Sequence, residues 1–282
     1  MKNIGIIMFC CILLICKQEV YATNNTDMLT LVNSFKKINE AQLATLDKLN
    51  NTFFIKLDEE SYAFPENLDI VTLGDSLTAG VGDESKSEGY VGYIDDKFNK
   101  TKKHSKITNF GISGYRSDQL LKKTKEKDVI KAIKSADLII MTIGANDLMK
   151  IFKKHVSDLQ VEPFFNEMNS YEKRLDSIFK SIKKSNPNAK IYLLGFYNPF
   201  AEYFADIDEL NYISSSWNAS SAMVAVKNKN VHFIPTADLF TDNTNSLLAE
   251  DNFHPNKKGY TKIAKEVIEH IQFGVDEAYD TK

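Results

Sequence analysis

From about residue 68 onward, short apolar runs alternate with longer amphipathic segments, and this alternation constrains the fold more than any other feature of the chain. Short runs rich in branched aliphatic residues are typical of strands buried on both faces. Segments with apolar residues spaced three and four apart are typical of helices that pack on such strands. Strands separated by helices predict a parallel sheet with right-handed crossovers.

The expected elements follow one another in regular order as far as residue 272. We expect strands at residues 68–73, 106–110, 137–143, 190–194 and 231–234. We expect helices at residues 90–98, 118–135, 171–184 and 256–271. Two aromatic-rich segments, 150–166 and 197–225, interrupt the alternation. Each follows a strand, so its aromatic side chains are expected either to line a substrate groove or to pack under a long loop.

The first 22 residues do not belong to this pattern. A basic start is followed by an apolar run at residues 4–16, which is short for a membrane span. Val20-Tyr21-Ala22 resembles a small-residue cleavage site. We therefore expect residues 1–22 to be a secretory signal peptide, and the protein to be secreted or associated with the cell surface. A lipoprotein site at Cys16 and an uncleaved anchor are the alternatives.

Composition narrows the class of protein. The chain is 43% hydrophobic and 26% charged, which suits a globular domain. The net charge is −3 and no basic block contains interleaved aromatic residues, so we expect no nucleic-acid partner. All three cysteines lie in the expected signal peptide, so we expect no disulfide or thiol chemistry. Residues 23–65 are expected to form an N-terminal helical segment ahead of one domain at residues 66–274.

The stretch Ile70–Gly82 places a serine directly after the first expected strand. Gly74 allows a sharp turn there. The turn would put Ser76 at the carboxyl edge of the sheet, where open α/β folds bind their ligands. Ser76 is therefore a candidate nucleophile, provided that the chain supplies a base, a group that orients the base, and donors for an oxyanion.

The base is expected to be a histidine, because its unperturbed pKa lies near neutral. Of the five histidines, His254 stands out in Asp251-Asn252-Phe253-His254-Pro255, just ahead of the last expected helix. A spacing of three lets one turn bring the Asp251 carboxylate to the imidazole, where it would fix the tautomer. Two alternatives remain: Asp251 caps the helix, or both residues bind a metal, although no further His or Cys clusters with them.

Two further sheet-edge positions could supply donors to an oxyanion. Gly114 follows the second expected strand, and a glycine can present its N–H without a side chain in the way. Asn146 follows the third strand and offers a side-chain NH₂. Simple turn formation is the alternative for the glycine, and an Asx turn that caps the next segment is the alternative for Asn146.

Four short motifs stand in order along the chain: Gly74-Asp75-Ser76-Leu77, Gly111-Ile112-Ser113-Gly114, Gly144-Ala145-Asn146-Asp147 and Asp251-Asn252-Phe253-His254. In this combination, over residues 68–272, the chain resembles the SGNH hydrolases, the GDSL esterase/lipase family, and among them the secreted bacterial lipase/acylhydrolase type. The resemblance implies a flavodoxin-like three-layer α/β/α sandwich with a parallel sheet.

The same resemblance implies a site and an activity. Ser76, His254 and Asp251 would form a catalytic triad, with an oxyanion hole made by the Ser76 N–H, the Gly114 N–H and the Asn146 side chain. The activity would be hydrolysis of carboxylic esters through an acyl-enzyme on Ser76, with no cofactor or metal.

The substrate class stays open at this point. A lipid or lysophospholipid would use the apolar residues of segments 150–166 and 197–225. An O-acetylated cell-wall sugar would instead stack on tyrosines and Trp217. Outside enzymes, the alternative is a surface binding module in which Gly74, Gly80 and Gly82 form an anion-binding turn, although the chain has neither phosphate-binding glycine motif.

Overall fold

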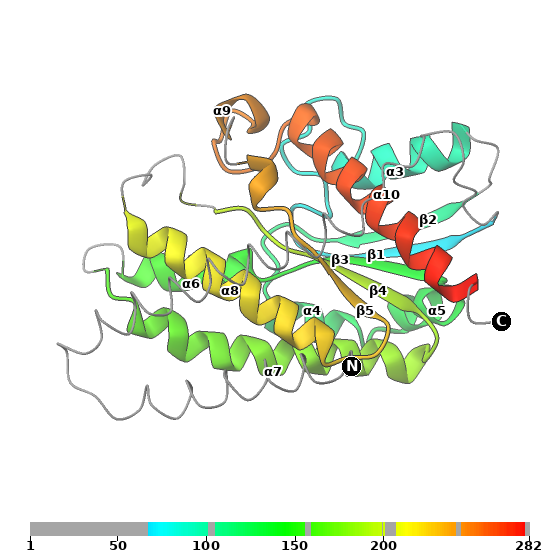
Figure 1. Cartoon of the computed structure of the whole chain (residues 1–282), viewed down its shortest axis with the longest axis horizontal. Coiled ribbons are helices and arrows are strands. Elements are labelled where there is room, and N and C mark those ends of the chain that lie inside the picture. Colours follow the sequence, from blue (N-terminus) through cyan, green and yellow to red (C-terminus); the bar gives the residue numbers. More distant parts are fainter. Residues whose placement is uncertain are drawn as a thin grey trace. The chain divides into compact units, whose positions relative to one another are not determined.

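The structure is a computed structural model of the chain (Figure 1). It describes residues 67–100, 105–155, 159–198, 200, 207–240 and 244–279. The expected signal peptide at residues 1–22 and the expected helical segment at residues 23–65 lie outside the described residues. Within the described part, no helix is both long enough and apolar enough to span a membrane.

The centre of the described domain is a five-stranded parallel sheet with the strand order β2-β1-β3-β4-β5. The strands are β1 (Asp69–Gly74), β2 (Lys106–Gly111), β3 (Leu138–Thr142), β4 (Lys190–Leu194) and β5 (Val231–Ile234). Gly74 lies in register with Gly111 on one side and with Thr142 on the other. The segments that leave β1, β2 and β3 therefore start side by side, at the point where the strand order reverses and open α/β sheets bind their ligands.

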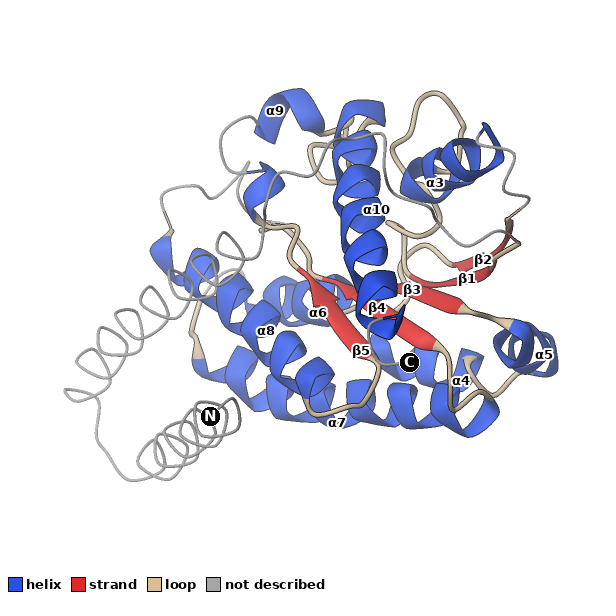
Figure 2. Ribbon diagram, turned by 45° about the vertical axis from the view of Figure 1, so that its right-hand side comes forward, coloured by secondary structure: helices blue, strands red, loops and turns tan. Residues whose placement is uncertain are grey.

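Helices cover both faces of this sheet (Figure 2). One face packs against α3 (Gly89–Lys100) and α10 (Lys257–Tyr279), together with the short η1 (Asp238–Phe240) and α9 (Thr244–Leu247). The other face packs against α4 (Ser117–Lys123), α5 (Lys127–Ser135), α6 (Ala145–His155), α7 (Glu162–Ser185) and α8 (Asp208–Val226). The expected flavodoxin-like three-layer α/β/α sandwich is confirmed.

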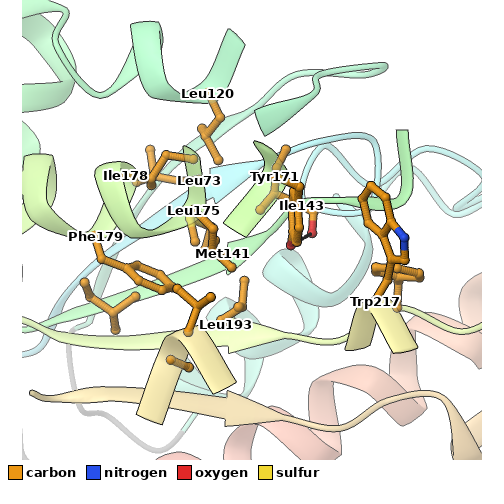
Figure 3. Close-up of a cluster of buried hydrophobic side chains, with 14 of the residues drawn as sticks. Leu73, Leu120, Met141, Ile143, Tyr171, Leu175, Ile178, Phe179, Leu193 and Trp217 are labelled. Carbon is orange, nitrogen blue, oxygen red and sulfur yellow. Dashed lines mark hydrogen bonds between the residues drawn. The ribbon is translucent and has the colours of Figure 1, made fainter. Parts of the chain in front are cut away.

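Two hydrophobic clusters, one on each face of the sheet, hold the layers together. Successive side chains of a strand point to opposite faces, so neighbouring strand residues belong to different clusters. In β1, Ile70 belongs to the cluster under α10, and its neighbour Val71 belongs to the cluster over α7. Figure 3 shows the cluster on the α7 side, where Met141 of β3 and Leu193 of β4 lie near Leu175 and Phe179 of α7. Each fully buried aliphatic or aromatic side chain contributes roughly 1.5–3 kcal/mol, so these clusters dominate the stability of the sandwich.

In three segments the secondary structure differs from the expectation by more than a few residues at an end. Residues 118–135 form two helices rather than one, because Thr124 ends α4 and its hydroxyl bonds to Leu121 and to Ser181 of α7. The interrupting segment 150–166 is largely the rest of α6 and the start of α7, with Pro163 in its first turn. Most of the segment 197–225 is α8. Their apolar residues at helical spacing bury a helix face and do not line long loops.

The expected role of Trp217 as a platform for sugars is also wrong. Trp217 is fully buried in α8 and stacks on Tyr171 of α7, with ring centroids 5.0 Å apart (Figure 3). Phe200 and Phe152 are also buried, with ring centroids 4.5 Å apart. These aromatic residues pack the core, as the alternative to a substrate groove predicted.

Candidate active site

The turn that follows β1 is held against the end of β3. A Cβ atom at Gly74 would lie 2.3 Å from the Thr142 carbonyl oxygen, so only glycine permits this approach. The carboxylate of the next residue, Asp75, is buried and accepts hydrogen bonds from the Leu77 N–H (3.1 Å) and the Thr142 hydroxyl (2.8 Å). Ser76 lies between Asp75 and Leu77, so these bonds fix its backbone.

Buried hydroxyl groups extend this support beneath the turn. Thr78 Oγ1 lies 2.7 Å from Thr142 Oγ1 and 2.9 Å from the Tyr90 hydroxyl. Burial raises the pKa of the Asp75 carboxyl, and its hydrogen bonds from Thr142 and Leu77 oppose that rise. Neither Thr142 nor Tyr90 was predicted from the sequence, because their approach to the turn depends on strand register and helix packing.

Asp251 and His254 are in direct contact. His254 Nδ1 lies 2.6 Å from Asp251 Oδ2, and Asp251 Oδ1 accepts the backbone N–H groups of Phe253 (3.0 Å) and His254 (2.9 Å). Partial burial works to raise the pKa of the Asp251 carboxyl, but the hydrogen bonds from His254 and Phe253 and the charge of His254 together hold that pKa below its ordinary value. The carboxylate therefore accepts the imidazole Nδ1–H and leaves Nε2 as the second ring nitrogen.

The helix-capping alternative for Asp251 is wrong. The helix α10 begins at Lys257, and the residue before it, Asn256, caps it. Asn256 Oδ1 accepts the N–H groups of Lys258 (2.9 Å) and Gly259 (3.1 Å). The Asp251 side chain is thus independent of the helix, and its hydrogen bonds to described residues stay within its own turn.

The histidine turn is supported from two directions. A Cβ atom at Gly82, where φ is +92°, would lie 2.7 Å from the His254 Cβ and 2.7 Å from the Pro255 carbonyl oxygen. On another side, the Tyr197 hydroxyl donates a hydrogen bond to the Phe253 carbonyl. Neither contact was predicted, because Gly82 and Tyr197 are far from His254 in the sequence.

The two predicted oxyanion donors outside the serine turn lie in neighbouring loops. Gly114 has a φ of +78°, and apart from its two chain neighbours no described residue has a heavy atom within 4 Å of the position where its Cβ would stand. The Asn146 side chain donates from Nδ2 to the Tyr115 carbonyl (3.0 Å), which leaves its second amide hydrogen available. Among the described residues, the N–H groups of Ser76 and Gly114 have no hydrogen-bond acceptor.

A small pocket brings the predicted residues together. It encloses about 10 Å³. Its lining consists of Asp75, Ser76, Leu77, Ala145, Asn146, Phe196, Tyr197, Phe253 and His254. Ser76, Asn146 and His254 thus share one space, and Asp251 reaches it through His254. Gly114 is not among the lining residues and is tied to the pocket through the neighbouring Tyr115.

The competing site interpretations find no support here. Within the described ranges, no group of three His, Cys, Asp or Glu residues could hold a metal ion. The three glycines proposed for an anion-binding turn make close contacts within the protein instead; a Cβ at Gly80, for example, would lie 2.5 Å from the Glu88 backbone. His155, His232 and His270 lie in α6, β5 and α10, away from the pocket. His104 lies outside the described residues.

The strand order and the polar side chains at the carboxyl edge define the class of protein as an open α/β protein with a flavodoxin-like sheet and a ligand site at its switch point. Residues 72–262 match the GDSL-like lipase/acylhydrolase family. The chain belongs to this family, and the resemblance of its four motifs to the GDSL esterase/lipase family is confirmed. The protein is accordingly a carboxylic ester hydrolase, an esterase or lipase of the GDSL type.

Three known proteins illustrate the relationship. The uncharacterized protein YpmR of Bacillus subtilis is 39% identical over 211 residues, which cover 73% of this chain and 82% of YpmR. The lipase Lip_vut3 from a goat rumen metagenome superposes with a TM-score of 0.65 at 22% identity, covering 72% of this chain and 97% of the lipase. A catalytic mutant of Axe2, an acetylxylan esterase from Geobacillus stearothermophilus, gives a TM-score of 0.56 at 23% identity, covering 74% and 95%. At these identities, the two solved structures show a common fold.

Proposed function

We propose that this esterase works through a Ser76–His254–Asp251 triad. The observation that carries the proposal is the Asp251–His254 pair, which is bonded at 2.6 Å and opens on the pocket that also contains Ser76. With Nδ1 donating to the carboxylate, Nε2 is the nitrogen that takes the Ser76 proton as Oγ attacks the ester carbonyl. The Asp251 carboxylate then stabilises the imidazolium, and His254 returns the proton to the leaving alcohol.

The oxyanion of the tetrahedral intermediate would be held by the N–H groups of Ser76 and Gly114 and by Asn146 Nδ2. The two backbone N–H groups have no acceptor among the described residues, and Asn146 has one remaining amide hydrogen. Donors aimed in advance at the developing charge cost no reorganisation during the reaction, and each contributes roughly 3 kcal/mol to transition-state stabilisation. Water, activated by His254, then releases the acyl group from Ser76.

The proposed substrates are esters with short acyl groups. The pocket beside Ser76 encloses about 10 Å³, room for one water-sized group, and its walls are mostly apolar. Leu77 and Tyr197 separate it from a second small pocket that Tyr90, Leu194 and Ile263 also line. A long acyl chain would need the two pockets to join, whereas a short acyl group such as acetyl would require a smaller displacement of the walls.

A second candidate function is removal of acetyl groups from sugars. The small pocket is the observation that favours it, and Axe2, which shares the fold, is named an acetylxylan esterase. Trp217 does not contribute a stacking platform, since it is buried. A rate profile from p-nitrophenyl acetate to palmitate, with O-acetylated sugars alongside, distinguishes the two functions. Preference for palmitate would contradict both.

The nucleophile is tested by Ser76→Ala together with labelling by a fluorophosphonate. We expect the variant to fold and to lose ester hydrolysis, and the wild type to take up one label, at Ser76. Ser135→Ala is the matched control, because Ser135 is exposed at the end of α5. Wild-type activity in Ser76→Ala, or a label on another residue, would refute the assignment.

We also propose that the protein is exported, by cleavage of residues 1–22, and acts outside the cytoplasm. The support is the basic start, the apolar run and Val20-Tyr21-Ala22. N-terminal sequencing of the protein from the culture medium and from washed cells tests this. A mature chain that begins at residue 23 is expected, and an intact Met1 in the cytoplasmic fraction would refute the proposal.

A further inference from the structure

Behind the two oxyanion loops lies a buried polar contact that the proposed mechanism does not use. Asp147 directly follows Asn146 and is 3% exposed, and Ser117, three residues after Gly114, is fully buried. The Ser117 N–H donates to Asp147 Oδ2 (2.8 Å), and the Ser117 hydroxyl donates to Asp147 Oδ1 (2.6 Å). The carboxylate thus holds the start of α4 against the start of α6.

A third helix completes this contact. Arg174 of α7 donates from Nε to the Ser117 hydroxyl (2.6 Å) and from one terminal nitrogen to Asp147 Oδ1 (3.2 Å). The same nitrogen donates to Glu167 Oε1 (2.6 Å) at the more exposed end of the group. We call Ser117, Asp147, Glu167 and Arg174 the Arg174 network. In each of its hydrogen bonds an N–H or O–H group donates to an oxygen atom. These bonds join α4, α6 and α7 and so fix the three helices relative to one another.

The residue that joins α7 to this contact is one of the few arginines of a lysine-rich chain. The sequence has 33 lysines but only two arginines, Arg116 and Arg174. A guanidinium is planar and presents several donors in a fixed fork, so it can bond the Ser117 hydroxyl and the Asp147 carboxylate together. A lysine ammonium at the same place is a point charge on a flexible stem. The network therefore uses a property that the lysines of the protein lack.

The network lies close to both oxyanion donors along the chain. Asn146 is adjacent to Asp147, and Gly114 is joined to Ser117 through Tyr115 and Arg116. Asn146 Nδ2 also donates to the Tyr115 carbonyl. The loop after β2 and the loop after β3 are therefore linked twice, by this bond and by the bond from Ser117 to Asp147. We propose that Arg174 is a positioning residue of the oxyanion hole, which holds the Gly114 N–H and the Asn146 amide at the spacing that the intermediate requires. This inference rests on the proposed function.

A purely structural role would not need these charges. Burying ion pairs generally adds little net stability, because desolvation offsets the attraction. The helices involved are already held by apolar packing, since Leu120 of α4, Leu148 of α6 and Leu175 of α7 share one buried cluster. Loss of the fork should therefore affect the geometry of the loops more than the stability of the fold.

The test uses Arg174→Lys, which keeps the charge and removes the fork. We expect a nearly unchanged melting temperature, an unchanged KM for p-nitrophenyl acetate, and a fall in kcat of about tenfold, less than the roughly hundredfold loss of a whole donor. Affinity for a boronic acid, which forms a tetrahedral anion on Ser76, should fall by the same factor as kcat. Affinity for a neutral alcohol, the kind of product that an alkyl ester releases, should not change.

The matched control is Lys180→Met, which removes a cation from the same helix at an exposed position where it pairs with Asp176. We expect this variant to keep the wild-type kcat. If Arg174→Lys does not fold, Ser117→Ala tests the same link, because it removes the acceptor of Arg174 on α4 and keeps the Arg174–Asp147 ion pair.

A double variant separates this inference from the proposed function. Asn146→Ala should itself lower kcat. Arg174→Lys should lower kcat by a smaller factor in the Asn146→Ala background than in the wild type, because both substitutions act on the same group of oxyanion donors. No effect of Asn146→Ala would refute the proposed oxyanion hole. Two outcomes would overturn the positioning role of Arg174 while leaving the proposed oxyanion hole intact, provided that Asn146→Ala lowers kcat as expected. One is an unchanged kcat and boronate affinity in Arg174→Lys. The other is a double variant whose loss in kcat equals the sum of the two single losses in free energy.

Discussion

Asp251→Asn separates the proposed triad from a Ser76–His254 dyad. The amide oxygen of the new side chain could still accept the N–H groups of Phe253 and His254, which lie 3.0 and 2.9 Å from Asp251 Oδ1 in the wild type. The other end of the side chain would become an NH₂ group, a donor, at the place where Oδ2 now lies 2.6 Å from His254 Nδ1. The ring would then have to accept at Nδ1 and carry its proton on Nε2, the nitrogen that must take the proton from Ser76.

The expected loss in kcat is large and the expected loss in stability is small. The same substitution in the triad of a serine protease lowers kcat by about 10⁴. A loss of about a hundredfold or more, roughly 2.7 kcal/mol of barrier, is expected here. The Asp251 side chain is 47% exposed and does not cap α10, so the melting temperature should hardly change.

The assay is kcat for p-nitrophenyl acetate at several pH values, with a thermal melt of each protein. Asp176→Asn is the control, because it neutralises an aspartate on α7 that pairs with the exposed Lys180. An unchanged kcat together with an unchanged melting temperature would refute the reasoning and remove Asp251 from the site. A tenfold loss would show that the carboxylate assists but that the tautomer is set mainly by other contacts.

Three further predictions concern the same site. Gly82→Ala should lower kcat with little change in KM, because the added Cβ would approach the His254 Cβ to 2.7 Å; a wild-type kcat would contradict that contact. EDTA should leave activity unchanged, and a loss that zinc restores would return Asp251 and His254 to a metal site. Since folding lowers the pKa of Asp251, its stabilisation is present above the unfolded pKa of about 3.9 and is lost as the pH falls through the folded value. Because the Asp251 side chain is 47% exposed, this contribution is small, and the decline of the melting temperature on acidification should be only slightly smaller in Asp251→Asn than in the wild type. A large difference between the two proteins would contradict the small stability effect expected for Asp251.

The sequence predicted the elements whose formation depends on local pattern. The bounds expected for β4 and β5 agree with the structure, because each strand is a short apolar run between polar segments. The contact of Asp251 with His254 was also predictable, since both residues lie within one turn and three positions determine the geometry. The family followed from four motifs whose order does not depend on the fold. The catalytic roles themselves remain predictions that the variants above test.

Only the tertiary structure decided which side chains support the site and which fill the core. An aromatic residue after a strand has the same appearance in the sequence whether it faces a substrate or the core, and packing between α7 and α8 buried Trp217. The Arg174 network joins residues that are 57 and 27 positions apart along the chain, through hydrogen bonds that need three helices in place. The pattern of a sequence shows periodicity over a few residues and therefore predicts single helices and strands. The contacts of Gly82 with His254 and of Arg174 with Ser117 join residues far apart along the chain, so they form only when the chain has folded.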